Sequence, residues 1–232
     1  MQKLSLFLLS LTLCGACRKD SAVPPLDTGN NIQFSKMAVG QKSYYVRLAG
    51  EGFREAAPYP STYLPDTLVA EVIAESAGVF TLKEYLTPGS ASILTPDKIA
   101  GMPGGSGEYV YKIKADQGKL QFVEQVSGLW HPRLFGKTTM VLPLAKNESA
   151  EIKLSGWMPG VDVTVNEGFV HDFQLSGISY GHLNFIRDYM DMAFDGEGYF
   201  YLYGAEEGIV RAGYVSSWGL PGTAWDLLKK AQ

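Results

Sequence analysis

The chain has 232 residues, which is enough for a substantial hydrophobic core and suits one all-β domain or two small ones. Its 20 Lys and Arg residues against 24 Asp and Glu residues give a formal net charge of −4, without a basic stripe, which argues against nucleic acid as a partner. Its 26 glycines and 13 tyrosines, with 19% charged residues, favour strands and turns over helices.

The first residues have the order of a secretion signal. Lys3 supplies a positive charge, residues 4–13 form a short apolar segment, and Gly15 and Ala16 supply small residues before a cleavage site. An apolar segment of roughly ten residues is too short to cross about 30 Å of hydrocarbon, so it does not read as a transmembrane helix. We therefore predict a signal peptide over residues 1–16.

The residue that follows, Cys17, carries a family resemblance. The region resembles the lipobox of bacterial lipoproteins, in which a leucine, two small residues and a cysteine are read together. In that family the cysteine thiol receives a diacylglycerol, the chain is cut before it, and the new amino group is acylated, for example with palmitate. Cys17 is preferred over Cys14 because Gly15 and Ala16 precede it, whereas the bulky Leu13 precedes Cys14. The alternative is a plain signal peptide.

The residues after Cys17 are polar and include Pro24 and Pro25, so they suit a tether better than a packed core. We assign residues 17–30 to the lipidated cysteine and a flexible linker, and residues 31–232 to a single antiparallel β domain. By the same resemblance, Arg18 directly after the cysteine implies the outer membrane of a Gram-negative cell. The Lys19–Asp20 pair resembles the charged tract that directs Bacteroidetes lipoproteins to the surface, and the periplasmic face stays an alternative.

The remaining chain shows period-two alternation interrupted by glycine turns, which predicts antiparallel hairpins. In residues 109–113, for example, Tyr109, Tyr111 and Ile113 share one face, and Gly118 supplies the positive φ of the turn that follows. The predicted strands are 67–75, 79–86, 108–115, 119–126, 152–157, 162–165, 169–175, 178–188, 199–203 and 209–215. Their spacing favours an all-β fold, a mostly antiparallel meander that forms a barrel, half-barrel or sandwich with little helix. A turn is expected at 166–168, and a terminal helical turn at 226–231.

Motifs that could carry catalysis are weak. Residues 177–181 match the Gly-x-Ser-x-Gly pattern of α/β-hydrolases, but the residues after it read as strand and no βαβ alternation surrounds it. His171 and His182 lack the short ligand pair that fixes a zinc site. We therefore predict no catalytic residue, no metal site and no cofactor.

The aromatic residues are the best candidates for ligand contact. Tyr199, Tyr201 and Tyr203 alternate with Phe200 and Leu202, which predicts a strand covered on both faces. A tyrosine-lined interior suits an amphipathic ligand, whereas tryptophans at strand ends or in turns suit stacking on sugar rings. The candidate ligand-binding residues are Trp130, Trp157, Tyr199, Tyr201, Tyr203, Trp218 and Trp225. The alternative is that these side chains only build the core.

The end of the chain, with Gly198-Tyr-Phe-Tyr-Leu-Tyr203 followed by Gly208-Ile-Val-Arg211, resembles the closing hairpin of secreted β-barrel lipoproteins. Lipoprotein-carrier-like half-barrels and lipocalin-like domains are examples of that class. The resemblance implies a curved antiparallel sheet around an apolar cavity, and it transfers no catalytic residue.

Together these patterns predict a membrane-anchored envelope lipoprotein of non-enzymatic type. Its expected partners are the membrane, through the lipid anchor, and an apolar or amphipathic ligand, a glycan or an envelope protein. Two alternatives remain, an envelope hydrolase that acts on glycan or lipid, and a structural accessory subunit of a surface complex.

Overall fold

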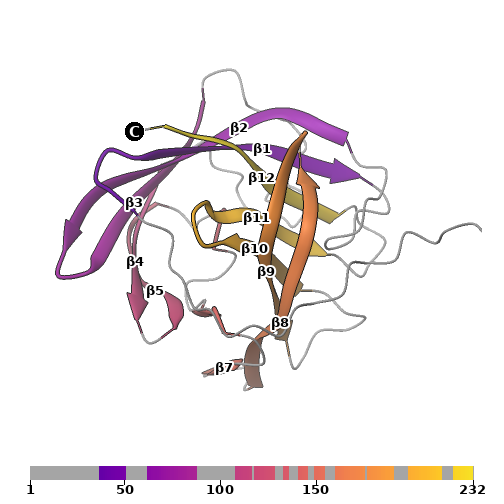
Figure 1. Cartoon of the computed structure of the whole chain (residues 1–232). Helices are drawn as coiled ribbons and strands as arrows, with labels where there is room; N and C mark the ends of the chain where they lie inside the picture. Colours follow the sequence, from indigo (N-terminus) through magenta and orange to yellow (C-terminus); the bar gives the residue numbers. More distant parts are fainter. Residues whose placement is uncertain are drawn as a thin grey trace, which may run out of the picture.

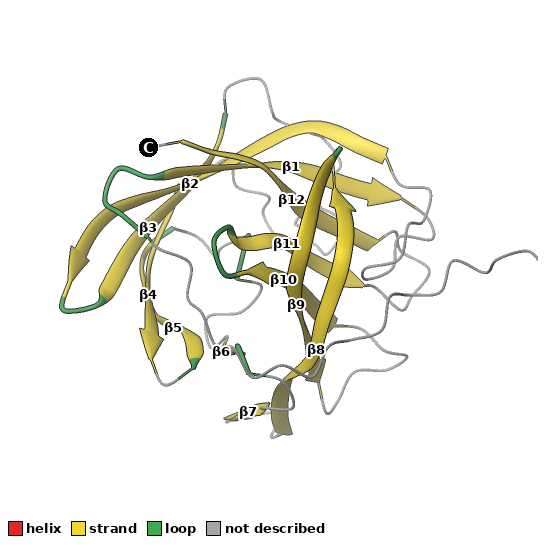
Figure 2. Ribbon diagram, viewed as in Figure 1, coloured by secondary structure: helices red, strands yellow, loops and turns green. Residues whose placement is uncertain are grey.

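The computed structural model describes residues 37–50, 62–87, 108–116, 118–128, 133–135, 141–145, 149–154, 160–175, 177–190, 198–215 and 222–231. These residues form strands, turns and loops, and none of them lies in a helix (Figure 2). The predicted signal peptide, the linker and Cys17 lie outside this part of the chain.

The strands are β1 (Lys42–Gly50), β2 (Thr62–Ser76), β3 (Val79–Leu86), β4 (Tyr109–Asp116), β5 (Lys119–Ser127), β6 (Val141–Pro143), β7 (Ser149–Leu154), β8 (Gly160–Leu175), β9 (Ile178–Met190), β10 (Gly198–Gly204), β11 (Gly208–Val215) and β12 (Gly222–Ala231). They form one 12-stranded sheet in the order β6-β5-β4-β3-β2-β1-β12-β11-β10-β9-β8-β7. Each half of the chain is therefore a meander, and antiparallel pairing of β1 with β12 joins the two halves. The predicted all-β antiparallel class is confirmed.

The sheet curls until its two edges, β6 and β7, come near each other, which gives an almost closed barrel (Figure 1). The side chain of Asn166, on β8, donates its Nδ2 group to the carbonyl of Pro143, on β6, at 3.2 Å, and to Asn184 Oδ1 at 2.9 Å. Asn166 is fully buried, so these bonds satisfy an amide that would otherwise be costly to hide. The bond to Pro143 ties β6, the last strand of the N-terminal meander, to the C-terminal meander across the seam.

The predicted hairpins are confirmed around the turns at Ala77–Gly78, Gly118 and 205–207, with strand bounds within one residue of those expected except that β2 begins five residues earlier, at Thr62. Two expectations are wrong. Residues 166–168 form a bulge inside the continuous strand β8, where Asn166 Oδ1 accepts the Gly168 N–H at 2.9 Å, so the chain does not reverse. Residues 226–231 belong to strand β12, because pairing with β1 and β11 overrides the helical preference of its Leu and Lys residues.

The β8–β9 hairpin is longer than its neighbours and adds a second layer. β9 pairs with β10 through Asn184–Arg187, and beyond Leu183 the hairpin continues to Ile178. Figure 1 shows this part crossing in front of β10, β11 and β12, and the ring of Phe173 lies 5.8 Å from the guanidinium of Arg211 on β11. The hairpin therefore covers the outer face of the C-terminal strands.

This second layer explains the composition of β10. Tyr201 and Tyr203 point to the barrel interior, Phe200 and Leu202 point to the opposite face, and all four are at most 2% exposed. The prediction that this strand is covered on both faces is confirmed. Burial of an aromatic or aliphatic side chain contributes about 1.5–3 kcal/mol, so this strand is a main stabilising element of the C-terminal half.

Candidate functional site

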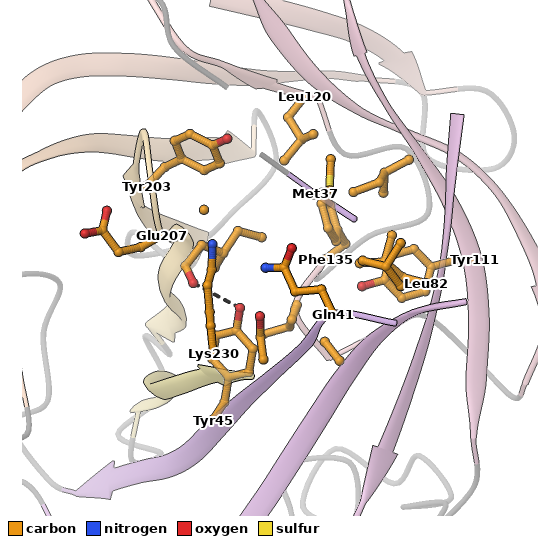
Figure 3. Close-up of a pocket in the computed structure, with 17 residues that line it drawn as sticks. Met37, Gln41, Tyr45, Leu82, Tyr111, Leu120, Phe135, Tyr203, Glu207 and Lys230 are labelled. Atoms are coloured by element: carbon orange, nitrogen blue, oxygen red, sulfur yellow. Dashed lines mark hydrogen bonds between the residues drawn. The ribbon is translucent and has the colours of Figure 1, made fainter. Parts of the chain in front are cut away.

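A cavity of about 60 Å³ lies inside the barrel, between the N-terminal strands and the β10–β11 turn, and is called the interior cavity below. It is lined by Met37, Gln41, Ser43, Tyr45, Ala70, Val72, Leu82, Tyr111, Ile113, Leu120, Leu134, Phe135, Tyr203, Glu207, Gly208, Ile209 and Lys230 (Figure 3). The alternation of each strand supplies this lining, because Ala70 and Val72 of β2, and Tyr111 and Ile113 of β4, are buried residues two positions apart.

One wall of the interior cavity is held by Glu84, on β3, which is 0% exposed. Its carboxylate accepts hydrogen bonds from the Tyr111 hydroxyl at 2.7 Å, the Arg133 N–H at 2.7 Å and the Leu134 N–H at 3.3 Å. Burial raises the pKa of Glu84 above its ordinary value, and these donors oppose that rise. Glu84 thereby fixes segment 133–135, and Leu134 and Phe135 form the wall.

The tyrosines of the interior cavity present rings, because their hydroxyls are engaged elsewhere. The Tyr45 hydroxyl donates to the Ile209 carbonyl at 3.0 Å, and the Tyr111 hydroxyl donates to Glu84. Burial raises the pKa of both phenols, so they stay neutral near pH 7. Tyr111 also packs against Phe122 and Phe135, with ring centroids 5.5 and 5.7 Å apart. An occupant would therefore meet a mostly apolar surface.

The polar rim of the interior cavity comes from Gln41, Lys230 and Glu207. Figure 3 shows the side chains of Gln41 and Lys230 extending toward the middle of the cavity, with Glu207 beside them. The Lys230 ammonium donates to the Glu206 carbonyl at 2.6 Å, and burial lowers the pKa of Lys230. The cavity thus has apolar walls and a rim with one positive and one negative group.

A second cavity, of about 360 Å³, lies between the β8–β9 hairpin and the β10–β11 turn, and is called the hairpin cavity below. It is lined by Phe169, Tyr180, Gly181, His182, Asn184, Ala205, Glu206 and Glu207. Burial, together with the negative charge of Glu207, raises the pKa of the Tyr180 phenol. Glu207 lines both cavities, so the β10–β11 turn borders each of them.

The candidate residues from the sequence are only partly brought together. Tyr203 lines the interior cavity, Tyr201 is fully buried in the core, and Tyr199 packs against Tyr214 at 5.1 Å. Trp225 lies within strand β12, opposite Arg47 and Ala212, so its expected place at a strand end or turn is wrong. The other three candidates, Trp130, Trp157 and Trp218, lie outside the described residues.

Sequence reasoning missed Tyr45, Glu84, Lys230 and Glu207. A signal for Tyr45 was present, because residues 44–46, Tyr-Tyr-Val, are aromatic and β-branched residues that favour a strand. Glu84 and Lys230 gave no such signal, because charged residues in strands normally face water.

The weaker motifs of the sequence lie in the β8–β9 hairpin. Ser179 is a strand residue paired with Gln174, without the strand-to-helix turn that a nucleophile elbow needs. His171 pairs with His182 across the hairpin, with ring centroids 4.8 Å apart, and His171 Nδ1 lies 3.2 Å from the Gly181 carbonyl. Within the described part of the chain, no group of three or more His, Cys, Asp and Glu residues is placed to hold a metal ion.

A search of the described residues for a helix long and apolar enough to cross a membrane finds none. No protein-family model matches the chain, and no curated protein matches it. One solved structure that matches is a protein from Bacteroides fragilis, described as a candidate exported protein with a YmcC-like fold. It is 10% identical, with a TM-score of 0.41, and the match covers 87% of this chain and 100% of that one.

Proposed function

We propose that this protein is a non-enzymatic lipoprotein of the cell envelope that binds the apolar end of an amphipathic molecule in the interior cavity. The observation that supports this function is the pairing of apolar walls with a charged rim at one opening. Rings and aliphatic side chains such as Leu82, Tyr111 and Phe135 form the walls, and Lys230 and Glu207 form the rim. Few convergent polar groups on an apolar pocket are typical of ligand sites.

The size of the interior cavity limits the occupant. A water-sized group needs roughly 10–15 Å³ of such volume, so about 60 Å³ holds roughly four to six groups of that size. At about 0.8 kcal/mol for each buried methylene, the end of an alkyl chain would gain roughly 3–5 kcal/mol. This corresponds to weak or moderate affinity, and a longer chain would extend past the rim.

A cavity-filling variant tests the proposal. Ala70 lines the interior cavity, whereas Ala74, on the same strand, is exposed, so Ala70→Leu and Ala74→Leu are a matched pair. In calorimetric titrations with 1-octanol, we expect saturable binding to the unaltered protein and to Ala74→Leu. Ala70→Leu should bind about tenfold more weakly, because it displaces about two methylenes of the ligand. Equal binding by the two variants, or no saturable binding by the unaltered protein, would contradict the proposal.

The proposal includes an acyl anchor at Cys17 and a location at the outer membrane. Several acyl chains hold a protein on a bilayer without a spanning segment. In cells fed labelled palmitate, we expect Cys17→Ser to abolish labelling and Cys14→Ser to retain it. Labelling of Cys17→Ser would contradict this assignment.

A further inference from the structure

The hairpin cavity holds two polar groups without a hydrogen-bond partner among the described residues. Tyr180 is 5% exposed, lines this cavity, and its hydroxyl makes no hydrogen bond with another described residue. The half-buried carboxylate of Glu207 lines the same cavity and makes no hydrogen bond or ion pair within the described part of the chain. The ring of Tyr180 is buried while its hydroxyl stays accessible from the cavity, so the hydroxyl is available to a ligand there.

The charged residues that line the hairpin cavity indicate whether its ligand is a cation or an anion. Its lining contains two acidic residues, Glu206 and Glu207, and among the described residues that line it there is no Lys or Arg. The ammonium of Lys230 lines the interior cavity, donates to the Glu206 carbonyl and interacts electrostatically with Glu206 and Glu207 from that side. Buried Phe169 and Tyr180 supply low-dielectric walls, which focus the negative potential. A cation is therefore favoured over an anion.

The type of cation follows from the groups available. A divalent metal prefers several converging oxygen ligands, and the described residues offer no such group. An ammonium needs one carboxylate and gains further from an aromatic ring, and Glu207 and Tyr180 supply both. His182 also lines this cavity, and its ring packs against that of Phe169 with the centroids 4.0 Å apart and the planes tilted by 40°.

We propose that the hairpin cavity binds the ammonium head of the amphipathic ligand whose apolar end occupies the interior cavity. This inference rests on the proposed function, and Glu207 links the two sites because it lines both cavities. The ligand class is therefore an alkylamine or another amphiphile with a cationic nitrogen. The polar head is held by Glu207 and the Tyr180 hydroxyl, on the outer side of the β10–β11 turn.

Three ligands with the same eight-carbon chain and different head groups separate the contribution of the head to the affinity from that of the tail. We expect octylamine to bind the unaltered protein about fivefold to tenfold more tightly than 1-octanol at pH 7, since a half-buried ion pair contributes on the order of one decade of affinity. Octanoate should bind more weakly than 1-octanol. Glu207→Gln should remove the preference, so that octylamine binds this variant no more tightly than 1-octanol does. Glu124→Gln, on the exposed face of β5, is the control and should behave as the unaltered protein.

The outcomes distinguish this inference from the proposed function. If 1-octanol and octylamine bind equally, or if Glu207→Gln keeps the preference for octylamine, the ammonium site is wrong while the apolar site stands. Backbone amide shifts in NMR spectra test the site directly with butylamine, which has little tail. We expect shifts at residues 180–182 and 205–207 that Glu207→Gln abolishes. Such shifts without binding of 1-octanol would overturn the proposed function and keep the ammonium site, and their absence would overturn the site.

Discussion

Two buried carboxyl groups of the barrel, those of Glu84 and Asp226, are held in opposite ways. In the N-terminal half, Glu84 is surrounded by neutral donors, the Tyr111 hydroxyl and two backbone N–H groups. In the C-terminal half, Asp226 is paired with Arg211 through contacts of 2.5 and 2.6 Å and also accepts the Tyr63 hydroxyl at 3.1 Å. The first arrangement leaves a carboxyl that can still titrate, and the second neutralises the charge.

The difference matches the task of each region. Glu84 holds segment 133–135 as a wall of the interior cavity, so its bonds shape a ligand site. The Arg211–Asp226 pair lies beneath the β8–β9 hairpin, where Phe173 covers the guanidinium, so its bonds join β2, β11 and β12 under a second layer. We infer that the surroundings of the Arg211–Asp226 pair resist a change of pH or of a single hydrogen bond more than the wall near Glu84 does.

The largest effect on stability is expected when the ion pair between Arg211 and Asp226 is broken. Asp226→Asn leaves the Arg211 guanidinium buried without its counter-charge, which should lower the free energy of unfolding by about 3–5 kcal/mol. Denaturant titration measures this loss. The double variant Arg211→Met/Asp226→Leu should lose much less, because it buries no unpaired charge. A loss below about 1 kcal/mol in the single variant would contradict the role given to the pair.

The packing of the C-terminal half can be tested at Gly213, which lies on the same face of β11 as Arg211. A Cβ atom on Gly213 would overlap the ring of Phe200, whereas one on Gly181 would meet nothing within 4 Å. Gly213→Ala should therefore cost about 2–3 kcal/mol of unfolding free energy through overpacking. Gly181→Ala, also in a strand, should change it by less than about 0.5 kcal/mol. Equal effects of the two variants in thermal unfolding would show that the layer is loosely packed.

The next prediction concerns the pH dependence of stability that the carboxyl of Glu84 causes. Because burial raises the folded pKa of Glu84 above its unfolded value of about 4.3, its contribution to stability is complete below that pH and is lost as the pH rises through the folded pKa. Glu84→Gln should cost about 2 kcal/mol at pH 4, since its amide cannot accept all three hydrogen bonds, and less at neutral pH. Denaturation curves at several pH values measure the difference. A cost that grows with pH would contradict the raised pKa.

The smallest effect concerns the donor to Glu84. Tyr111→Phe removes one hydrogen bond to the carboxylate and should cost about 1 kcal/mol. It should also move the pH-dependent loss of stability to higher pH, because a donor that favours the ionised form is gone. The same variant leaves the ring that lines the interior cavity, so binding of 1-octanol should change little. A large loss of binding would show that the wall depends on this hydroxyl.

The sequence reveals the local part of this fold better than the long-range part. The hairpins around Gly78, Gly118 and Gly208 follow from alternation and from turn glycines with positive φ. The pairing of β1 with β12 joins residues almost 190 positions apart, such as Lys42 and Ala231, and no local pattern encodes it. Strand β12 also contains Leu and Lys residues that favour a helix when considered alone.

The candidate site was predictable only in kind. Alternating Tyr199, Tyr201 and Tyr203 indicated a tyrosine-rich interior, and Tyr203 does line the interior cavity. Glu84 and Leu82 lie on the same inward face of β3. A carboxyl at that position is tolerated because segment 133–135, nearly 50 residues away, supplies hydrogen-bond donors. The hairpin cavity depends on the β8–β9 hairpin crossing the β10–β11 turn, which is a property of the tertiary fold.

The most direct measurement of the central claim is a crystal soaked with 8-bromo-1-octanol, in which anomalous scattering locates the bromine. The account predicts a bromine peak inside the interior cavity, among Leu82, Tyr111 and Phe135, with the hydroxyl directed to the rim at Lys230 and Glu207. The peak should disappear in Ala70→Leu. A bromine bound elsewhere on the barrel, or none in the cavity at saturating ligand, would contradict the claim.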